Sequence, residues 1–245
     1  MSGAPDSLWD ALPLGKGVGI LARDPNGLAA LDKPAGVLSH PNKAGDEPRS
    51  LLTAPYRMEG EFFEWPGGKL WLLNRLDSAT SGVILVAGSA ALAETVRSQF
   101  RQKKVRKAYL ALVYGIPRRT PDTWKDRLAV ERKGGRIRTG EGTVPSESRM
   151  SVVRSGGGMA LLRLEPLTGR SHQLRVQCAK RGLPIAGDQT YGDFRRNRKF
   201  AKAAGTRRLF LHSLETAFDY EWAGRTFSFA AQSPVPAEFE SAARS

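Results

Sequence analysis

The stretch from Leu70 to Ser89, LWLLNRLDSATSGVILVAGS, constrains the fold of this chain most strongly. Two apolar runs flank a polar segment that contains Arg75 and Asp77 and ends in the turn residues Ser81-Gly82. Short apolar runs bounded by turn signals predict two buried strands joined by a loop. A carboxylate in such a loop either caps backbone N–H groups or acts as a nucleophile kept ionised by a nearby cation. The stretch alone favours the cap.

Much of the remaining chain also has the pattern of strands. Further strand-like runs occur at Val18–Ala22, Leu28–Leu31, Ala108–Val113, Met150–Val153, Met159–Glu165, Leu209–Leu214 and Thr226–Ala230. Turn residues such as Asp24-Pro25-Asn26-Gly27 predict hairpins between neighbouring runs. In the polar region 118–150 we expect short antiparallel strands with turns at Gly134-Gly135 and Gly140. The predicted fold class is α+β, with a mixed, mostly antiparallel central sheet and flanking helices.

Few segments have a helical pattern. The predicted helices are Ser50–Met58 within the loop region 41–69, Ala90–Gln102, Ser171–Arg181 and a short terminal helix or tail after Pro236. The second of these has an apolar residue at every fourth position from Leu92 to Phe100, which is typical of an amphipathic helix. For the third, Ser171 is the expected N-cap and Gly182 the expected stop.

The charge balance favours a polyanionic partner. Lys and Arg number 38 against 24 Asp and Glu, which gives a formal net charge of +14. Nucleic acid is the first candidate, and a basic protein that is merely well solvated is the alternative. The cations concentrate in two clusters, Arg97–Lys107 and Arg195–Arg208. We expect both clusters to flank the functional site.

Several classes of protein are not favoured. No apolar run reaches the length of a membrane span, and no secretory signal is visible at the N-terminus. The single cysteine, Cys178, excludes internal disulfides and indicates a reducing, cytoplasmic setting. The three histidines, His40, His172 and His212, lie in unrelated motifs, so we expect no metal site.

Several motifs, taken in order, resemble those of the RluA-type pseudouridine synthase family. They are LDKPAGVLSHP (Leu31–Pro41), RLD with TSG (Arg75–Gly82), KAYLALVYG (Lys107–Gly115), TGRSHQLRV (Thr168–Val176), GDQTYG (Gly187–Gly192) and LHS (Leu211–Ser213). The resemblance runs from about Leu28 to about Ala217. It implies a pseudouridine synthase fold with an active-site cleft, formed by a catalytic domain over residues 18–245 after an irregular lead-in over 1–17. Members of the family often carry an N-terminal RNA-binding S4 domain, and we expect none here because the residues before the first motif leave no room for it.

The resemblance also implies the chemistry and the residues that perform it. The expected activity is isomerisation of specific uridines in ribosomal or transfer RNA by a monomer, without cofactor or metal. Asp77 stands at the position of the catalytic aspartate, Tyr109 at that of a tyrosine that stacks on the target uracil, and Arg175 at that of the basic residue paired with the aspartate. The residues expected to bind substrate are Arg75, Thr80, Arg170, His172 and Gln173. Among these, Arg75 is expected to occupy the space of the flipped-out base, and His172 and Gln173 are expected to order the loop.

The sequence departs from the family pattern at two positions. Asn74 and Gln177 stand where histidines are usual, which leaves open the geometry around the catalytic groups. Two other functions stay open beside the synthase. One is an RNA-binding or RNA-folding module of the same fold with an idle site. The other is a glycosidase or nucleosidase that uses Asp77, although a second carboxylate is not evident and the net charge of +14 is then unexplained.

Overall fold

The computed structural model describes residues 6–133 and 136–242, and these form two compact units. Unit 1 takes the chain up to Arg106 and takes it up again over Ser213–Pro234. Unit 2 takes Lys107–His212 and the chain from Val235 onward. The assignment of residues 18–245 to a single catalytic domain stays a prediction.

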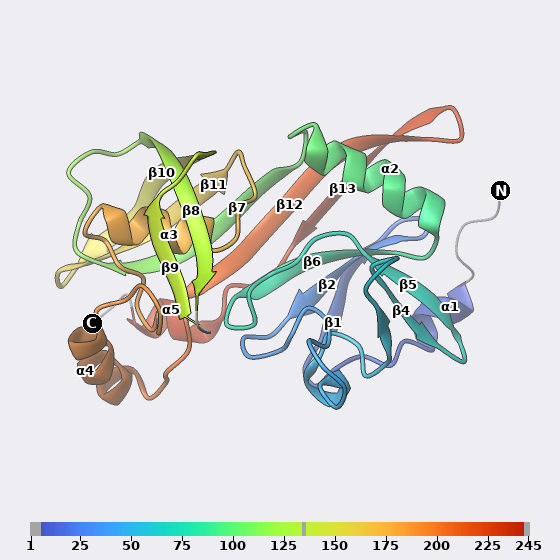
Figure 1. Cartoon of the computed structure of the whole chain (residues 1–245), viewed down its shortest axis with the longest axis horizontal. Helices are drawn as coiled ribbons and strands as arrows, with labels where there is room; N and C mark the ends of the chain where they lie inside the picture. The colour runs from blue at the N-terminus through green and yellow to red at the C-terminus, as the bar shows by residue number, and fades with distance from the viewer. Residues whose placement is uncertain (1–5, 134–135, 243–245) are drawn as a thin grey trace. The chain divides into compact units, whose positions relative to one another are not determined.

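Unit 1 is built on an antiparallel sheet with one long helix (Figure 1). Its elements are α1 (Asp6–Asp10), β1 (Gly19–Arg23), β2 (Leu28–Lys33), the 3-10 helix η1 (Glu47–Arg49), β3 (Tyr56–Arg57), β4 (Phe62–Trp65), β5 (Gly68–Leu72), β6 (Ser81–Ala87), α2 (Ala90–Arg101), β12 (Leu211–Trp222) and β13 (Arg225–Gln232). The strand order is β3-β4-β5-β6-β12, with β2 pairing β6 and β1, and β13 pairing β12. The short helix α1 lies within the segment expected to be irregular.

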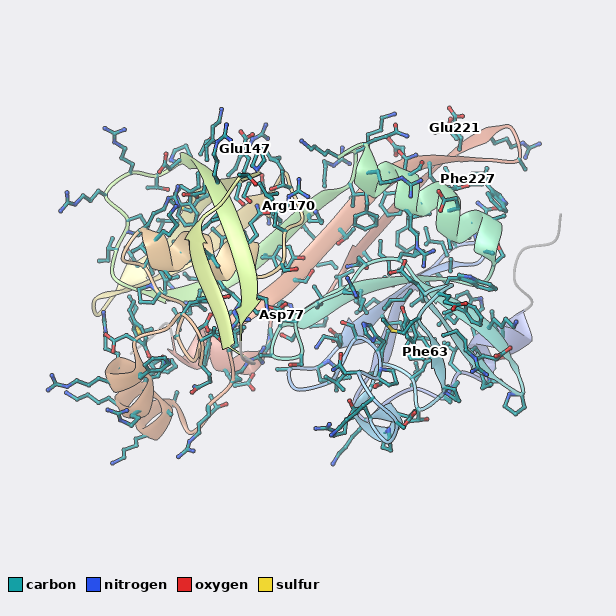
Figure 2. The ribbon with its side chains drawn as sticks, viewed as in Figure 1. Phe63, Asp77, Glu147, Arg170, Glu221 and Phe227 are labelled. Carbon is teal, nitrogen blue, oxygen red and sulfur yellow. The ribbon has the colours of Figure 1, made fainter. Side chains whose placement is uncertain are left out.

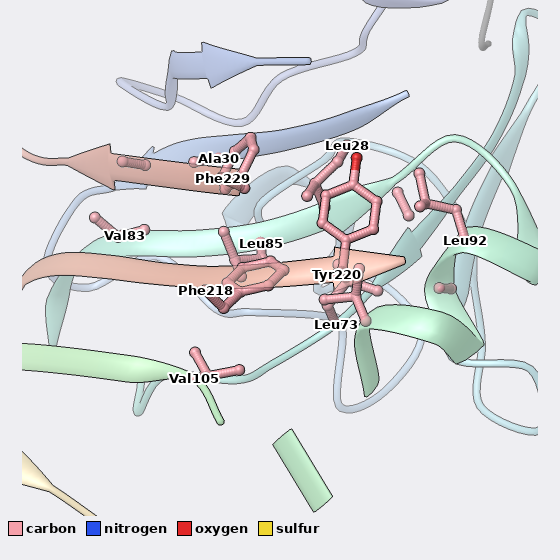
Figure 3. Close-up of a cluster of buried hydrophobic side chains, with 14 residues drawn as sticks. Leu28, Ala30, Leu73, Val83, Leu85, Leu92, Val105, Phe218, Tyr220 and Phe229 are labelled. Carbon is pink, nitrogen blue, oxygen red and sulfur yellow. The ribbon is translucent and has the colours of Figure 1, made fainter. Parts of the chain in front are cut away.

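The core of unit 1 forms where α2 packs beside this sheet. Side chains from β2, β6, β12 and β13 meet those of α2 in one buried cluster, which includes Leu28, Val83, Leu85, Leu92 and Phe218 (Figure 3). Each such side chain contributes about 1.5–3 kcal/mol when it leaves water. The Ser89 hydroxyl accepts a hydrogen bond from the Leu92 N–H and caps α2, so the predicted helix is confirmed.

The first predicted hairpin is also confirmed, with β1 and β2 antiparallel. The Asp24 carboxylate holds its turn by accepting hydrogen bonds from the N–H groups of Asn26 (3.0 Å) and Leu28 (2.9 Å). The Asn26 amide donates in turn to the Tyr220 hydroxyl on β12 (2.7 Å). The turn therefore fastens the N-terminal hairpin to a strand almost 200 residues later in the sequence.

The strands of unit 2 are antiparallel neighbours in the order β7-β11-β10-β8-β9 (Figure 1). Its elements are β7 (Arg106–Tyr114), β8 (Asp122–Lys133), β9 (Arg136–Glu141), β10 (Val144–Gly156), β11 (Met159–Pro166), α3 (Gln173–Lys180), α4 (Phe194–Ala204) and α5 (Ala237–Ala242). Gly156 pairs with Met159, which confirms the predicted hairpin. Strands β8 and β10 are long rather than short as expected, and the turn predicted at Gly134-Gly135 lies outside the described residues.

One helix prediction was wrong, and one helix was not predicted. Ser50–Met58 is not a helix, because Tyr56 and Arg57 pair with Phe63 and Phe62 as strands β3 and β4. Tyr56 packs edge-on against Phe63, so an aromatic pair across the strands replaces the expected helical packing. The second error is an omission, because α4 lies in the basic stretch where no helix was predicted. Across residues 6–133 and 136–242, no helix is long and apolar enough to cross a membrane.

Candidate active site

The loop that carries Asp77 joins β5 to β6 in unit 1 (Figure 2). The Leu73 N–H donates to the Leu85 carbonyl (3.0 Å), and the Leu85 N–H donates to the Asn74 side-chain oxygen (2.8 Å). Asn74 thus continues the pairing of the two strands by one further hydrogen bond. This gives the residue that stands in place of the usual histidine a defined structural use.

Buried polar groups fix the middle of the loop. The Ser39 hydroxyl donates to the Leu76 carbonyl (2.7 Å) and accepts from the Leu76 N–H (3.0 Å). The ammonium of Lys33, which is fully buried, donates to the carbonyls of Val37 (2.6 Å), Pro34 (3.0 Å) and Ser78 (3.0 Å). The residues on either side of Asp77 are therefore held by the LDKPAGVLSHP segment. These hydrogen bonds join the LDKPAGVLSHP motif to the RLD motif, although the two motifs lie far apart in the sequence.

Within this frame the predicted residues of unit 1 differ in exposure. Asp77 is half-buried and Arg75 is exposed, so both can be reached from solvent. Thr80 is buried, and its N–H donates to the Asp77 carbonyl (3.0 Å), which closes the turn. Gly82 follows with φ of +108°, and an added Cβ would lie 2.1 Å from the Ser213 carbonyl oxygen. Only glycine fits there without displacement of the β12 backbone.

In unit 2, Arg175 forms a buried ion pair with Asp188, a partner that the sequence analysis did not identify. The pair is bidentate, with Nε–Oδ2 and Nη2–Oδ1 distances of 2.8 Å, and the side chains are 8% and 1% exposed. Burial opposes ionisation of Asp188, but Arg175 and the N–H groups of Tyr191 and Thr190 outweigh it and hold the pKa of this carboxyl below its usual value. The GDQTYG motif supplies Asp188, and it was the available signal.

The start of α3 differs from the prediction. Ser171 is not the N-cap: His172 occupies that position with φ of +54°, and the helix begins at Gln173. The ring Nδ1 of His172 lies 2.9 Å from the Tyr191 hydroxyl. The Tyr191 ring also faces the Arg175 guanidinium, 5.1 Å from its centroid. His172 and Arg175 therefore meet the same tyrosine, which follows Asp188 in the GDQTYG motif.

A buried amide network runs along the other side of α3. The Gln173 side-chain oxygen accepts from the Thr168 hydroxyl (2.7 Å) and the Arg170 N–H (3.1 Å), and its amide donates to the Glu147 carbonyl (3.0 Å) and the Ser148 hydroxyl (3.0 Å). All hydrogen-bonding positions of the Gln173 amide group are thus used inside the protein. The loop-ordering role of Gln173 stays a prediction.

Gln177 extends this network at the second position where a histidine is usual. Its oxygen accepts from the Ser148 hydroxyl (2.7 Å), and its amide donates to Asp126 (3.0 Å). Burial opposes ionisation of Asp126, but hydrogen bonds from Gln177, Arg181 and Lys180 hold its pKa below the usual value. A neutral amide suits this position because it donates and accepts at the same time without adding a charge.

Two further predicted residues lie in unit 2. Tyr109 is half-buried on β7, opposite Leu164 of β11. Lys107, two residues earlier on the same strand, is also half-buried, and burial lowers its pKa. Arg170 is exposed at the loop before α3 (Figure 2).

The predicted site residues thus fall into two sets, one in each unit. Asp77, Arg75 and Thr80 belong to unit 1, whereas the remaining five, Tyr109, Arg170, His172, Gln173 and Arg175, belong to unit 2. The pairing of Arg175 with Asp77 and all of the catalytic and binding roles stay predictions. Across the part of the chain that the structure describes, no three His, Cys, Asp or Glu side chains gather as a metal site.

The predicted site residues lie in a part of the chain that is similar to known proteins. Residues 27–180 match the family model described as RNA pseudouridylate synthase. Ribosomal large subunit pseudouridine synthase C of Vibrio vulnificus is 33% identical over 193 residues, covering 79% of this chain and 59% of that protein. Its namesake from Escherichia coli is 32% identical over 215 residues, covering 83% and 63%. The chain therefore spans about three-fifths of the length of the curated relatives it matches.

The fold also has counterparts among solved structures. Human RNA Pseudouridylate Synthase Domain Containing 4 superimposes with a TM-score of 0.68 at 24% identity, covering 91% of each chain. Human RNA Pseudouridylate Synthase Domain Containing 1 gives 0.67 at 24% identity, covering 93% of this chain and 88% of that one. At this identity the likeness speaks for the fold alone, and it agrees with the predicted fold class.

Proposed function

Because this chain belongs to the RNA pseudouridylate synthase family, of the RluA type, we propose that it isomerises uridine to pseudouridine in RNA. The names of its relatives favour large-subunit ribosomal RNA as the substrate, ahead of transfer RNA. The observation that carries the proposal is the Asp77 loop, which lies inside the matched residues and holds a half-buried carboxylate between two internally bonded strands. We further propose a cytoplasmic monomer that needs no cofactor.

The reaction breaks the bond between uracil N1 and ribose C1′, turns the base, and joins C5 to C1′ while the C5 hydrogen leaves as a proton. The sugar becomes electron-poor when the base departs as an anion, which is the situation in which carboxylates serve glycosidic-bond chemistry. We assign to Asp77 the attack on the sugar, the abstraction of its C2′ proton or the stabilisation of its positive charge. Its position in a tightly held loop keeps the carboxylate in place without a large entropy cost at the moment of reaction.

A uridine stacked in RNA must leave the stack before a half-buried carboxylate can reach its C1′. Arg75 is exposed two residues before Asp77, and we propose that its side chain fills the space of the extruded base. We assign to Tyr109 the face of the uracil ring, because a half-buried aromatic side chain offers a stacking surface.

Arg175 serves in this proposal as the cation that keeps the catalytic carboxylate ionised. Its bidentate hydrogen bonds to Asp188 fix the plane of its guanidinium, and Tyr191 covers one face. An arginine that is oriented in this way keeps its positive charge in a fixed position before the reaction begins. In this proposal Thr80 and Arg170 serve the binding of the RNA, and His172 and Gln173 order the loop.

The test is the release of tritium from RNA labelled at uridine C5, because formation of the C5–C1′ bond expels that hydrogen. Unmodified ribosomal and transfer RNA transcripts are incubated with the wild type and with Asp77→Asn. We expect release from ribosomal RNA by the wild type only, with RNA affinity of the variant within about twofold. Asp219→Asn, at an exposed carboxylate of unit 1, serves as the matched control and should act as the wild type.

Each other outcome has a defined meaning. Wild-type release that survives in Asp77→Asn would refute the assignment of the catalytic carboxylate. No release from either RNA, together with intact RNA binding, would favour the RNA-binding module with an idle site.

A further inference from the structure

Helix α4 of unit 2 has two opposite faces. Asn197 is buried, and Phe200, Ala201 and Ala204 follow it at helical spacing on the side toward the unit. The other face carries four exposed cations at the same spacing, which are Arg195, Arg198, Lys199 and Lys202. We call these four residues the cationic stripe. Helix α4 contains no acidic residue, and its N-cap is Asp193.

The buried face is firmly anchored. The Asn197 side-chain oxygen accepts from the Gly187 N–H (2.8 Å) and the Tyr114 hydroxyl (3.0 Å), and its amide donates to the Asp188 carbonyl (2.9 Å). Phe200 packs edge-on against Tyr114 and Phe210, with ring centroids 6.0 and 5.1 Å apart. The helix is therefore a rigid element, although its sequence is mostly polar.

All four side chains of the cationic stripe are exposed. Arg196 stacks over the Tyr114 ring at 4.3 Å and donates to the Gly158 carbonyl, so it serves packing. Among the described residues, none of the four stripe cations forms an ion pair. Their like charges repel one another, and no ion pair among the described residues offsets this cost, which is typical of a surface that meets an anionic partner.

An exposed aromatic ring borders the stripe. Phe194 is 52% exposed and lies one helical turn before Arg198. Cations interleaved with an exposed aromatic ring suit the backbone and the base faces of single-stranded nucleic acid.

We propose that α4 is a docking helix for the RNA substrate, in which the cationic stripe binds backbone phosphates and Phe194 stacks on an unpaired base. The inference rests on the proposed function, since it names the surface that holds the RNA. The stripe spans about 10 Å along the helix, which is enough for three or four phosphates of one strand.

The hydrogen bonds of Asn197 connect helix α4 to the candidate catalytic groups of unit 2. Asn197 bonds the backbone of Gly187 and Asp188, and the Asp188 carboxylate orients Arg175. RNA held on α4 is thereby held at a fixed distance from Arg175. Asn197 is a positioning residue in this arrangement, and it does not touch the RNA.

The test compares two variants that lose the same charge. In the stripe variant, the four stripe cations become glutamine, a good helix former that keeps α4 intact. In the matched control, four exposed cations scattered over unit 1 become glutamine, namely Lys16, Arg23, Lys43 and Arg225. Affinity for fluorescein-labelled oligouridine and for unmodified large-subunit ribosomal RNA is measured by anisotropy and filter binding across a salt series. Circular dichroism verifies the fold of both variants.

For the stripe variant we expect the slope of log Kd against log salt to fall by about 2 to 3, since each phosphate contact with a single strand contributes about 0.7. The corresponding loss of affinity at 0.1 M salt is roughly 100-fold. The scattered variant should stay within about threefold of the wild type, and Phe194→Leu should bind oligouridine about fivefold more weakly or worse while Phe194→Trp keeps the affinity. Equal behaviour of the stripe and scattered variants would overturn the proposal, and an unchanged Kd for Phe194→Leu would overturn its base-stacking part.

Tritium release separates this inference from the proposed function. Release by the wild type, with an unchanged salt slope in the stripe variant, would overturn the docking helix and leave the synthase activity standing. Weakened binding of the stripe variant, with no release by the wild type, would support the docking helix and contradict the enzyme.

Discussion

Removal of the Asp188 carboxylate should be among the most costly single changes in unit 2. Asp188→Ala leaves the Arg175 guanidinium, 8% exposed, without its two hydrogen bonds of 2.8 Å. The N–H groups of Thr190 and Tyr191 also lose their acceptor. Breaking a buried ion pair by removing one partner costs about 3–5 kcal/mol, because the other charge stays buried. For a chain of this size the melting temperature should fall by roughly 6–20 °C.

The assay is urea unfolding at neutral pH, followed by circular dichroism. The control is the double variant Arg175→Met with Asp188→Leu, which removes both charges and fills the space with apolar atoms. We expect it to be more stable than Asp188→Ala, since well-packed apolar residues often replace a buried pair at little cost. Equal midpoints of Asp188→Ala and the wild type would refute the reasoning, as would a double variant that is less stable than the single one.

The same pair predicts a pH dependence. The folded-state pKa of Asp188 lies below the ordinary value of about 4, so the carboxylate contributes its stability fully above that value. That contribution is lost as the pH falls through the folded-state pKa. The difference in unfolding free energy between the wild type and Asp188→Ala should therefore be constant between about pH 5 and 8 and shrink below about pH 4. A difference that grows on acidification would contradict the assignment.

Two further changes test the loop of unit 1. Lys33→Met removes the ammonium that donates a hydrogen bond to the Ser78 carbonyl. We therefore expect kcat for tritium release to fall by about 10- to 100-fold while KM for RNA stays within about twofold. A change in KM alone would count against a positioning role for Lys33. Gly82→Ala places a Cβ 2.1 Å from the Ser213 carbonyl oxygen, so the free energy of unfolding in urea should fall by roughly 2–6 kcal/mol. In the control, Gly36→Ala, φ is +91° but no atom lies within 4 Å of the added Cβ, so the loss should be smaller. Equal losses in the two variants would exclude the clash as the cause.

Much of the fold could be predicted from local patterns in the sequence. The apolar runs around Asp77 became β5 and β6, and the Asp24 turn became a hairpin, because in both cases the deciding interactions lie within a few residues of each other. The helix α2 followed from its apolar spacing and the Ser89 cap for the same reason.

The failures have a different origin. The pattern of α4 was missed because its central buried residue is Asn197, whose burial depends on partners at Gly187 and Tyr114 rather than on an apolar side chain. The pairing of Arg175 with Asp188 likewise depends on a loop 13 residues away and cannot be deduced from spacing. Motif resemblance supplied the candidate residues, whereas the hydrogen bonds that orient them required coordinates.

The interleaved course of the chain has a consequence for folding during synthesis. Residues 107–212, which include nearly all of strands β7 to β11, leave the ribosome before Ser213–Pro234 can complete unit 1 with β12 and β13. Unit 2 waits in turn for α5, whose fully buried Phe239 packs against Phe210. Neither unit is therefore a contiguous piece of the gene, and a frameshift or stop codon ahead of residue 213 deprives both units of core residues at once. Dissection of this protein into halves that fold separately would need circular permutation rather than simple truncation.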